Sequence, residues 1–347
     1  MPTDASTSSA LASAIENLAA GRPLDVESAR LAVGAILDGT AGEVETAAFL
    51  TALHVKGETG DELLGAVQAI RERMIPFDPG RDGGIDTCGT GGDRAGTVNI
   101  STGAAVVVAA CGVPVVKHGN RAASGKSGSS DVLLELGVAV EAEPAVLRRG
   151  LDELGVAFLF APRFHPGLRG VAPIRKRLPF RTVFNLVGPL CNPASPPYQL
   201  VGVPREAHAR RMAEVLSRTP SIRRAVVVRG ADGLDEVSLA GETEVLLVEG
   251  GRIDRLTWTP ADFGLPETHA RGLAVDGPAE SAALLRKTFQ GGDGPARAYI
   301  LANAAAAVWT AEGTPLRDAV ARAADALDSG RAADLLARWA EVSQEAS

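Results

Sequence analysis

Glycine, hydroxyl and acidic residues are concentrated in two neighbouring segments that could bind phosphate. The first, Gly-Thr-Gly-Gly-Asp at 89–93, directly follows a short apolar run at 85–88. Glycines there let backbone N–H groups approach an anion without obstruction by side chains. The second, Thr-Val-Asn-Ile-Ser-Thr at 97–102, opens a predicted helix whose first N–H groups favour another phosphate, and the hydroxyls of Ser101 and Thr102 could bind phosphate or a metal. No lysine follows the glycines, so this is neither a GxGxxG nor a P-loop motif, and taken alone it is better explained as a glycine-rich turn with a serine cap.

Another polar loop follows the next predicted buried strand, 113–116. It begins Lys-His-Gly-Asn-Arg at 117–121 and continues as a Gly/Ser-rich stretch through Lys126 to Asp131. Ligands of open α/β sheets bind beyond the carboxyl ends of the strands, where this loop would lie. Two such strand-to-helix loops in succession predict a ligand that carries two phosphate groups.

Carboxylates form a third candidate site at Asp232, Asp235 and Glu236, after a predicted strand at 225–228. Bringing carboxylates together at a strand end is unfavourable unless a cation compensates them. Mg²⁺ prefers one or two protein carboxylates together with substrate phosphates and water. A magnesium site and a solvated acidic turn are both consistent with this segment.

A basic segment at 165–181 contains Arg175, Lys176, Arg177 and Arg181. A guanidinium group can bind a carboxylate through two parallel hydrogen bonds. The local pattern, however, indicates only a solvated basic face of a helix, and nothing in it distinguishes Arg175 from its neighbours.

The elements that would position these residues fall into two groups. The first 76 residues predict helices only, with Asp25 capping a helix to Leu37, a capping box Thr40-x-x-Glu43, and a second capping box Thr59-x-x-Glu62. From Gly84 onward, apolar strands alternate with helices, which predicts an α/β fold with a mainly parallel central sheet flanked by helices, beside a smaller all-helical domain. Segment 166–178 interrupts this alternation and is expected to form a helix that packs on the N-terminal subdomain. The remaining predicted elements are strands at 157–160 and 200–203, helices at 101–111, 130–136, 144–154 and 206–217, and a hairpin of 244–248 with 253–257.

Composition narrows the class of protein. The chain has 347 residues, a formal charge of −7 and 46% hydrophobic residues, which suits a globular protein of about two domains. An acidic chain argues against broad binding of nucleic acid. Three widely spaced cysteines and five scattered histidines predict neither a disulfide framework nor a zinc site. No export or membrane signal is visible, so we expect a cytoplasmic protein.

The motifs taken together resemble the anthranilate phosphoribosyltransferase family. GTGGD and NIST are followed by KHGNR, by HP…APIR…FNLxGPLxNP and by GLDE, in this order and over essentially the whole chain. The resemblance implies transfer of phosphoribose from phosphoribosyl pyrophosphate (PRPP) to the amine of anthranilate, in tryptophan biosynthesis. It also implies a small helical domain at 1–78 plus about 165–185, for dimerisation and the acceptor, and a large α/β domain at 79–164 and 186–347 that binds PRPP and Mg²⁺.

The resemblance further implies roles for individual residues. Ser101 and Glu236 would share one Mg²⁺, and Asp235 and Glu236 a second. Gly89, Asn120 and Arg175 would bind anthranilate, with Arg175 on its carboxylate. No dedicated acid or base is implied, and the partners are the two small-molecule substrates and a second copy of the chain. The residues implied to bind PRPP are Gly89, Gly92, Asp93, Thr97, Asn99, Ile100, Ser101, Thr102, Lys117, His118, Gly119, Asn120, Arg121, Ala122, Ala123, Ser124, Gly125 and Ser129.

The chain departs from the family's pattern at Leu168, where a bulky Met or Tyr is common, and at Gly170, where a His is common. Both positions line the route of anthranilate in the family, so acceptor tolerance is expected to differ. Two other functions are compatible with the same scaffold. A nucleoside phosphorylase would carry an HTGGTxDKLE-like segment, which is absent, and a non-catalytic nucleic-acid-binding homologue would be basic.

Overall fold

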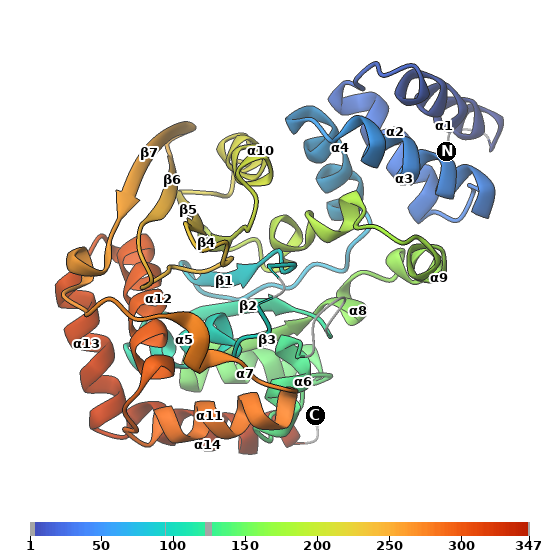
Figure 1. Cartoon of the computed structure of the whole chain (residues 1–347). Coiled ribbons are helices and arrows are strands. Elements are labelled where there is room, and N and C mark those ends of the chain that lie inside the picture. The colour runs from blue at the N-terminus through green and yellow to red at the C-terminus, as the bar shows by residue number, and fades with distance from the viewer. Residues whose placement is uncertain (1–3, 94, 122–126, 346–347) are drawn as a thin grey trace. The chain divides into compact units, whose positions relative to one another are not determined.

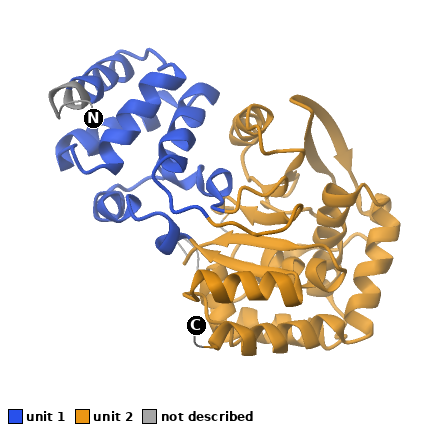
Figure 2. Ribbon diagram, turned by 180° about the vertical axis from the view of Figure 1, so that it is seen from behind, with its two compact units in different colours: residues 1–76, 161–193 blue, residues 77–160, 194–347 orange. Residues whose placement is uncertain are grey.

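The computed structural model describes residues 4–93, 95–121 and 127–345, and the chain folds into two compact units (Figure 2). Unit 1 comprises residues 1–76 and 161–193, and unit 2 comprises 77–160 and 194–347. The sequence-based boundaries lie at 78, about 165 and 185, within a few residues of two of these junctions and eight residues before the third. None of the helices in the described ranges is long and apolar enough to cross a membrane.

Unit 1 is entirely helical. α9 packs against α2 and α3, which is the packing expected of segment 166–178. Asp25 caps α2 through the Ser28 N–H, and the capping box of Thr59 with Glu62 opens α4, as the sequence predicts. Its helices are α1 (Asp4–Ala19), α2 (Val26–Leu37), α3 (Glu43–Lys56), α4 (Gly60–Arg71), α8 (Ala161–Phe164) and α9 (Leu168–Arg177), with the 3₁₀ turns η1 (Val183–Asn185) and η2 (Gly188–Cys191).

The predicted capping box at Thr40 is wrong. α3 begins three residues later, at Glu43, with Gly42 as its N-cap. The Thr40 hydroxyl instead donates to the carbonyl of Ala35 at the end of α2. The same Thr-x-x-Glu pattern therefore caps a helix at Thr59 and closes one at Thr40.

Unit 2 is built on one seven-stranded sheet with the order β3-β2-β1-β4-β5-β6-β7 (Figure 1). The first five strands in this order are parallel, and β6 and β7 form an antiparallel hairpin. The fold class predicted from the sequence is confirmed. The strands are β1 (Ile85–Gly89), β2 (Val115–Gly119), β3 (Val156–Phe160), β4 (Tyr198–Gly202), β5 (Arg224–Gly230), β6 (Thr243–Glu249) and β7 (Arg252–Trp258).

The parallel strands are buried on both faces because helices cover them. α5 packs against β1 and β2, α12 packs against α5, β4 and β5, and α10 packs against β5, β6 and β7. α12 is rich in alanine, which lets it lie close to α5, and most of its residues are fully buried. The helices of unit 2 are α5 (Ile100–Ala110), α6 (Ser129–Glu135), α7 (Pro144–Leu154), α10 (Glu206–Ser217), α11 (Pro278–Phe289), α12 (Pro295–Glu312), α13 (Leu316–Asp328) and α14 (Arg331–Gln344), with the 3₁₀ turns η3 (Pro260–Phe263) and η4 (Ala270–Leu273).

The second strand differs from its sequence-based bounds. The sequence predicts a strand at 113–116 followed by a loop, whereas β2 spans Val115–Gly119 and pairs with β3 along its whole length. Lys117 and His118 therefore lie inside the sheet rather than in the loop after it. The apolar run 113–116 could not reveal this, because the strand continues through two polar residues whose partners are far away in the sequence.

Candidate functional site

The predicted site residues of unit 2 gather at the carboxyl ends of β1, β2 and β4. β1 lies between β2 and β4. The connection after β1 leads to β2 on one side of it, and the chain later returns to form β4 on the other side. Such a switch in strand order opens a crevice beyond the strand ends, where ligands of α/β sheets bind. Each of the three strands ends in glycine, at Gly89, Gly119 and Gly202.

The segment with Asp235 and Glu236 packs directly on two of these strand ends. A Cβ atom added to Gly202 would overlap the backbone carbonyl of Asp235, and one added to Gly89 would lie 2.5 Å from Asp235 Oδ2. Only glycine permits this approach. The sequence alone could not identify Gly202 as part of the site, because the segment that requires a glycine there is more than thirty residues away along the chain.

Two backbone N–H groups hold the carboxylates. The Gly91 N–H donates to Asp235 Oδ2 at 2.7 Å, and the Ser101 N–H, at the start of α5, donates to Glu236 Oε1 at 3.1 Å. Gly91 and Gly92 have φ angles of 64° and 91°, which other residues rarely adopt. The glycine loop and the amino end of α5, both predicted to bind phosphate, thus also position the protein's own carboxylates.

Burial and mutual repulsion disfavour the ionised form of both acids. Burial, with repulsion from Asp93, raises the pKa of Asp235 to about 7, and the Gly91 N–H opposes the shift. The pKa of Glu236 lies well above its usual range because of burial and repulsion from Asp235, partly offset by Lys117. A carboxylate pair with one nearby lysine is left with excess negative charge, which a bound cation would compensate.

The donor set fits Mg²⁺ in the presence of a phosphate ligand. Among the described residues no group of three or more His, Cys, Asp or Glu side chains could hold a metal by itself. Mg²⁺ needs no such group, because it binds one or two carboxylates and takes its other ligands from phosphate and water. Asp235, Glu236 and the Ser101 hydroxyl supply hard oxygen ligands of the kind that Mg²⁺ prefers.

Lys117 is an internal cation. It is 2% exposed, and its Nζ donates to the Thr87 carbonyl on β1 and lies 3.4 Å from Ser101 Oγ. The neighbouring His118 is also buried, and its backbone N–H donates to Asp86 Oδ1 at 3.2 Å. Both residues anchor β2 to β1 beneath the predicted phosphate site.

Asn99 joins three segments of the site. Its Oδ1 accepts from the hydroxyls of Ser127, at 2.7 Å, and Ser281, at 3.0 Å, and its Nδ2 donates to the Ser127 carbonyl at 3.3 Å. The next residue, Ile100, contributes its side chain to the hydrophobic core. Thr102 Oγ1 is buried and has no hydrogen-bond partner among the described residues.

The loop after β2 is described only at its two ends. The Asn120 carbonyl accepts from Ser129 Oγ at 3.3 Å, which closes the base of the loop. The Arg121 side chain is 62% exposed and lies 3.6 Å from Glu141. Thr97, on the other side of the site, forms a β-bridge with Ala274. The predicted PRPP ligands Ala122, Ala123, Ser124 and Gly125 lie outside the described residues.

Arg175 belongs to unit 1, near the end of α9. Lys176 and Arg177 beside it are exposed, whereas Arg175 is half-buried and its guanidinium lies over the Phe184 ring at 5.6 Å. Burial and the nearby Arg181 lower the pKa of Arg175, and its Nε has no hydrogen-bond partner in the described part of the chain. The structure thus distinguishes Arg175 from the neighbouring basic residues of the helix, which the sequence alone could not do.

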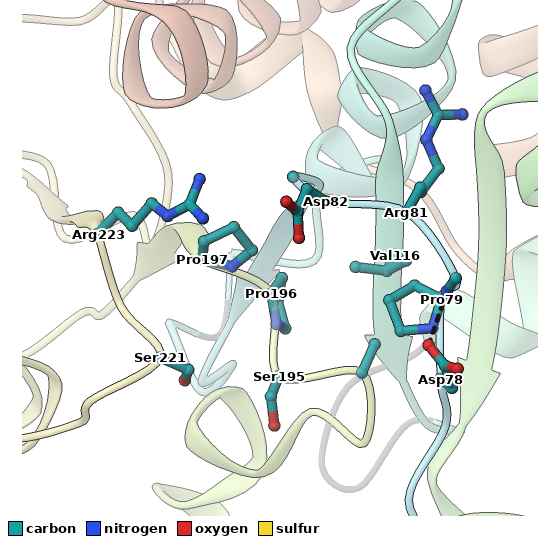
Figure 3. Close-up of a pocket in the computed structure, with 13 residues that line it drawn as sticks. Asp78, Pro79, Arg81, Asp82, Val116, Ser195, Pro196, Pro197, Ser221 and Arg223 are labelled. Carbon is teal, nitrogen blue, oxygen red and sulfur yellow. Dashed lines mark hydrogen bonds between the residues drawn. The ribbon is translucent and has the colours of Figure 1, made fainter.

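A cavity of about 560 Å³ lies elsewhere in unit 2 (Figure 3). Asp82, Pro197 and Arg223 line it, together with the residues that precede β1, β4 and β5. It therefore lies at the amino ends of the strands, and it contains none of the predicted site residues. The residues that the motifs predict to bind phosphate and metal lie at the opposite, carboxyl ends of the strands.

The comparisons with known proteins first define the class. Residues 81–333 match the model of the glycosyl transferase family a/b domain, and residues 12–74 match that of the glycosyl transferase family helical bundle domain. The two matches fall in unit 2 and unit 1 respectively, except for the inserted residues 161–193. An α/β domain with a helical bundle is the architecture of this glycosyl transferase family.

Individual relatives define the family more narrowly. The anthranilate phosphoribosyltransferase of Rhodopirellula baltica is 43% identical over 98% of this chain and 100% of its own length, and that of Rhodospirillum rubrum is 45% identical over 99% and 98%. The crystal structure of the enzyme from Thermus thermophilus superposes with a TM-score of 0.89 at 40% identity, covering 96% of this chain and 99% of that one. The chain belongs to the anthranilate phosphoribosyltransferase family.

A more distant relative has been seen with ligands. The anthranilate phosphoribosyltransferase of Saccharomyces cerevisiae, in complex with PRPP and Mg, superposes with a TM-score of 0.87 at 28% identity and covers 96% of this chain and 97% of that one. The same yeast enzyme in complex with 4-fluoroanthranilate gives a TM-score of 0.86 at 27% identity, over 98% of both chains.

Proposed function

We propose that this chain transfers the 5-phosphoribosyl group of PRPP to the amine of anthranilate, giving N-(5-phosphoribosyl)anthranilate and pyrophosphate in tryptophan biosynthesis. The observation that carries the proposal is the pair Asp235 and Glu236, held by N–H groups of the two phosphate-type loops at the carboxyl ends of β1 and β4. The family supports it, since PRPP and an anthranilate analogue are both bound by the yeast relative.

PRPP would bind along the glycine loop, the amino end of α5 and the loop after β2. The glycine loop would let its backbone approach the pyrophosphate without obstruction by side chains, and the amino end of α5 would supply a favourable dipole. Arg121 is the cation among the described predicted ligands that is exposed enough to reach a ligand, whereas Lys117 acts from beneath through Ser101. The full proposed set is that implied by the motifs, Gly89, Gly92, Asp93, Thr97, Asn99 to Thr102, Lys117 to Gly125 and Ser129.

Two magnesium ions would accompany PRPP, one on Ser101 and Glu236 and the other on Asp235 and Glu236. When bound, Mg²⁺ would neutralise the charge that develops on the departing pyrophosphate. The chain's own contribution is to keep the two carboxylates side by side before the ligand arrives, through the Gly91 and Ser101 N–H groups. Their raised pKa values mean that binding a cation would release protons.

Anthranilate would be oriented by Arg175, Asn120 and Gly89. The Nε of the half-buried Arg175 has no hydrogen-bond partner among the described residues, which suits a two-point hydrogen bond to a carboxylate. In the reaction the amine nitrogen forms a bond to C1 of the ribose, the C1–O bond to pyrophosphate breaks with its electron pair, and the amine loses one proton. An aromatic amine is largely unprotonated near neutral pH, so positioning and charge stabilisation would carry catalysis rather than a dedicated base.

We further propose that the protein is a homodimer formed through unit 1. Two large apolar side chains on α3, Val44 and Val55, are 78% and 79% exposed, a degree of exposure that a partner surface would relieve. Light scattering of the wild type and of a Val44→Lys, Val55→Lys double variant tests this, and a dimeric double variant contradicts it.

The decisive experiment follows the loss of anthranilate fluorescence in the presence of PRPP and Mg²⁺. We expect loss that depends on both, and none in the matched mixture without PRPP. Phosphate-dependent cleavage of thymidine, assayed beside it, detects a nucleoside phosphorylase. An active thymidine assay with a silent anthranilate assay would overturn the proposed function.

A further inference from the structure

A single amide side chain interrupts the apolar surface of α12. Asn303 lies in the middle of this helix, directly before a run of four alanines, and is 1% exposed. An unpaired amide buried among apolar side chains would destabilise the fold. Asn303 is tolerated there because every bond it makes is to backbone, and most of those bonds reach outside its own helix.

The partner of Asn303 is the residue that follows the acidic pair. This residue is Val237. The Oδ1 of Asn303 accepts from the Val237 N–H at 2.9 Å, and the Nδ2 of Asn303 donates to the Val237 carbonyl at 3.1 Å. A second Nδ2 hydrogen bond, at 2.9 Å, goes to the Tyr299 carbonyl one turn back in α12 and fixes the orientation of the amide. The two-point bond to Val237 thus fixes the backbone at one end of the pair.

The other end of the pair is fixed by close packing. The Asp235 backbone lies against Gly202, and the side chains of Asp235 and Glu236 accept the N–H groups of Gly91 and Ser101. Repulsion between the two carboxylates acts to separate them. Gly202 limits movement of the pair on one side. Among the described residues, Asn303 provides the only side-chain bonds to the Val237 backbone, and these bonds oppose the separation on the other side.

A serine on α11 makes the same kind of contact with the other loop. Ser281 is fully buried, its Oγ accepts from the Asn99 N–H at 3.0 Å, and its hydroxyl donates to Asn99 Oδ1 at 3.0 Å. Asn99 directly precedes α5, whose Ser101 N–H holds Glu236. Each of the two successive helices α11 and α12 therefore reaches one loop of the site with one buried polar side chain.

We infer that Asn303 and Ser281 are positioning residues for the metal and pyrophosphate site. Neither is expected to touch substrate. Asn303 keeps the carboxylate pair together so that a divalent cation binds without first reorganising the loop, and Ser281 keeps the amino end of α5 in place for the pyrophosphate. The inference rests on the proposed function, and it extends the site to two helices that none of the sequence motifs includes.

The test compares Asn303→Leu with a matched control, Thr310→Val. Both replace a fully buried polar residue of α12 by an apolar one of similar size, but the Thr310 hydroxyl bonds only to Ala306 within the helix. We expect N303L to weaken Mn²⁺ binding at saturating PRPP, measured by electron paramagnetic resonance, by about tenfold or more, because the Val237 groups lose their partners. The anthranilate KM should stay within about twofold, and T310V should leave both quantities unchanged.

A second pair of variants tests the same inference if N303L does not fold. Ser281→Ala removes the bonds to Asn99, and Ser343→Ala removes a similar bond that a buried serine of α14 makes with the Ala139 N–H. We expect S281A to raise the PRPP dissociation constant, measured by calorimetry with Mg²⁺, by about fivefold, and S343A to leave it unchanged. Unaltered Mn²⁺ binding in folded N303L, or unaltered PRPP binding in S281A, would overturn the inference. Failure of the wild type to consume anthranilate while it binds PRPP and Mn²⁺ would instead overturn the proposed function alone.

Discussion

The two units each bury ionisable groups whose charge the described residues do not fully compensate, and the two charges have opposite signs. Unit 2 buries Asp235 and Glu236 with Lys117 as the nearby cation, so the ionised forms of the two acids are not fully compensated and their pKa values are raised. Unit 1 half-buries Arg175 beside a second arginine and an aromatic ring, so positive charge is in excess. An isolated buried charge destabilises a fold. Each of these groups therefore contributes little to stability by itself and is a candidate for binding a ligand of opposite charge.

The difference between the units is consistent with the two substrates of the proposed reaction. The acidic pair of unit 2 lies beside the glycine loop and the amino end of α5, which suit phosphate, so it favours a cation together with an anion. The excess positive charge of unit 1 lies beside the Phe184 ring, so it suits an aromatic carboxylate. PRPP with Mg²⁺ and anthranilate are complementary to these two environments respectively.

The largest effect is expected from Asp235→Asn. This substitution removes one of the proposed metal ligands, and we expect kcat/KM at fixed Mg²⁺ to fall by about 10²–10³-fold. Because it also removes repulsion within the buried pair, the free energy of unfolding without metal should rise by about 1–2 kcal/mol. Steady-state kinetics and urea unfolding measure the two. Asp254→Asn, the same change at an exposed position on β7, is the control. A D235N protein that keeps its activity and is less stable than the wild type would contradict the assignment of Asp235 as a buried metal ligand.

Arg175→Met tests the opposite charge. We expect the anthranilate KM to rise by about 10–100-fold, because a charged hydrogen bond is lost, while the PRPP dissociation constant stays unchanged. Methionine retains the apolar stem beside Phe184, so the packing of unit 1 should survive. Arg177→Met on the same helix is the control, since that side chain is 77% exposed and pairs with Glu43. Equal KM values in the two variants would refute the assignment of Arg175.

The two units should also respond to pH in opposite directions. His165 in unit 1 is buried, and burial lowers its pKa to about 4, against a backbone hydrogen bond at Cys191 that raises it. Between pH 6.5 and 4 the unfolded chain binds a proton there that the folded chain does not, so stability falls as the pH falls, by up to about 3 kcal/mol. Asp235 has a raised pKa of about 7, so the folded chain keeps a proton that the unfolded chain releases, and stability falls as the pH rises from about 4 to 7.

Urea unfolding between pH 4 and 8 separates these two slopes. All three tryptophans, at 258, 309 and 339, belong to unit 2, so their fluorescence follows that unit, whereas circular dichroism follows the helices of both. We expect His165→Gln to remove the loss of stability at falling pH seen by dichroism. We expect D235N to reduce the loss at rising pH seen by fluorescence, with the remainder due to Glu236. Slopes that are unchanged in both variants would contradict the assigned protonation states.

Local signals in the sequence were sufficient for the helices and for the site motifs. α7 and α10 have the predicted bounds, 144–154 and 206–217, because Pro144 and an apolar stripe at helical spacing mark them locally. The carboxyl-end location of the loops follows from the α/β alternation. These features need no knowledge of distant partners.

Features that depend on distant partners could not be predicted. β2 extends to Gly119 because it pairs with β3, about forty residues away, along its whole length. Gly202 and Asn303 became visible only when the fold placed them against residues 235 and 237.

The smallest expected effect comes from a glycine that, unlike Gly202, has space around it. Gly170 lies exposed inside α9, and no atom lies within 4 Å of a Cβ added there. Gly170→Ala should therefore stabilise unit 1 by about 0.5–1 kcal/mol, because alanine favours helix and restricts the unfolded chain. The dichroism midpoint in urea measures this. Gly167→Ala, whose Cβ would lie 3.1 Å from the Leu37 carbonyl, should gain less. Because unit 2 carries the tryptophans, G170A should leave the fluorescence midpoint unchanged, and a shift of that midpoint would show that the two units do not unfold independently.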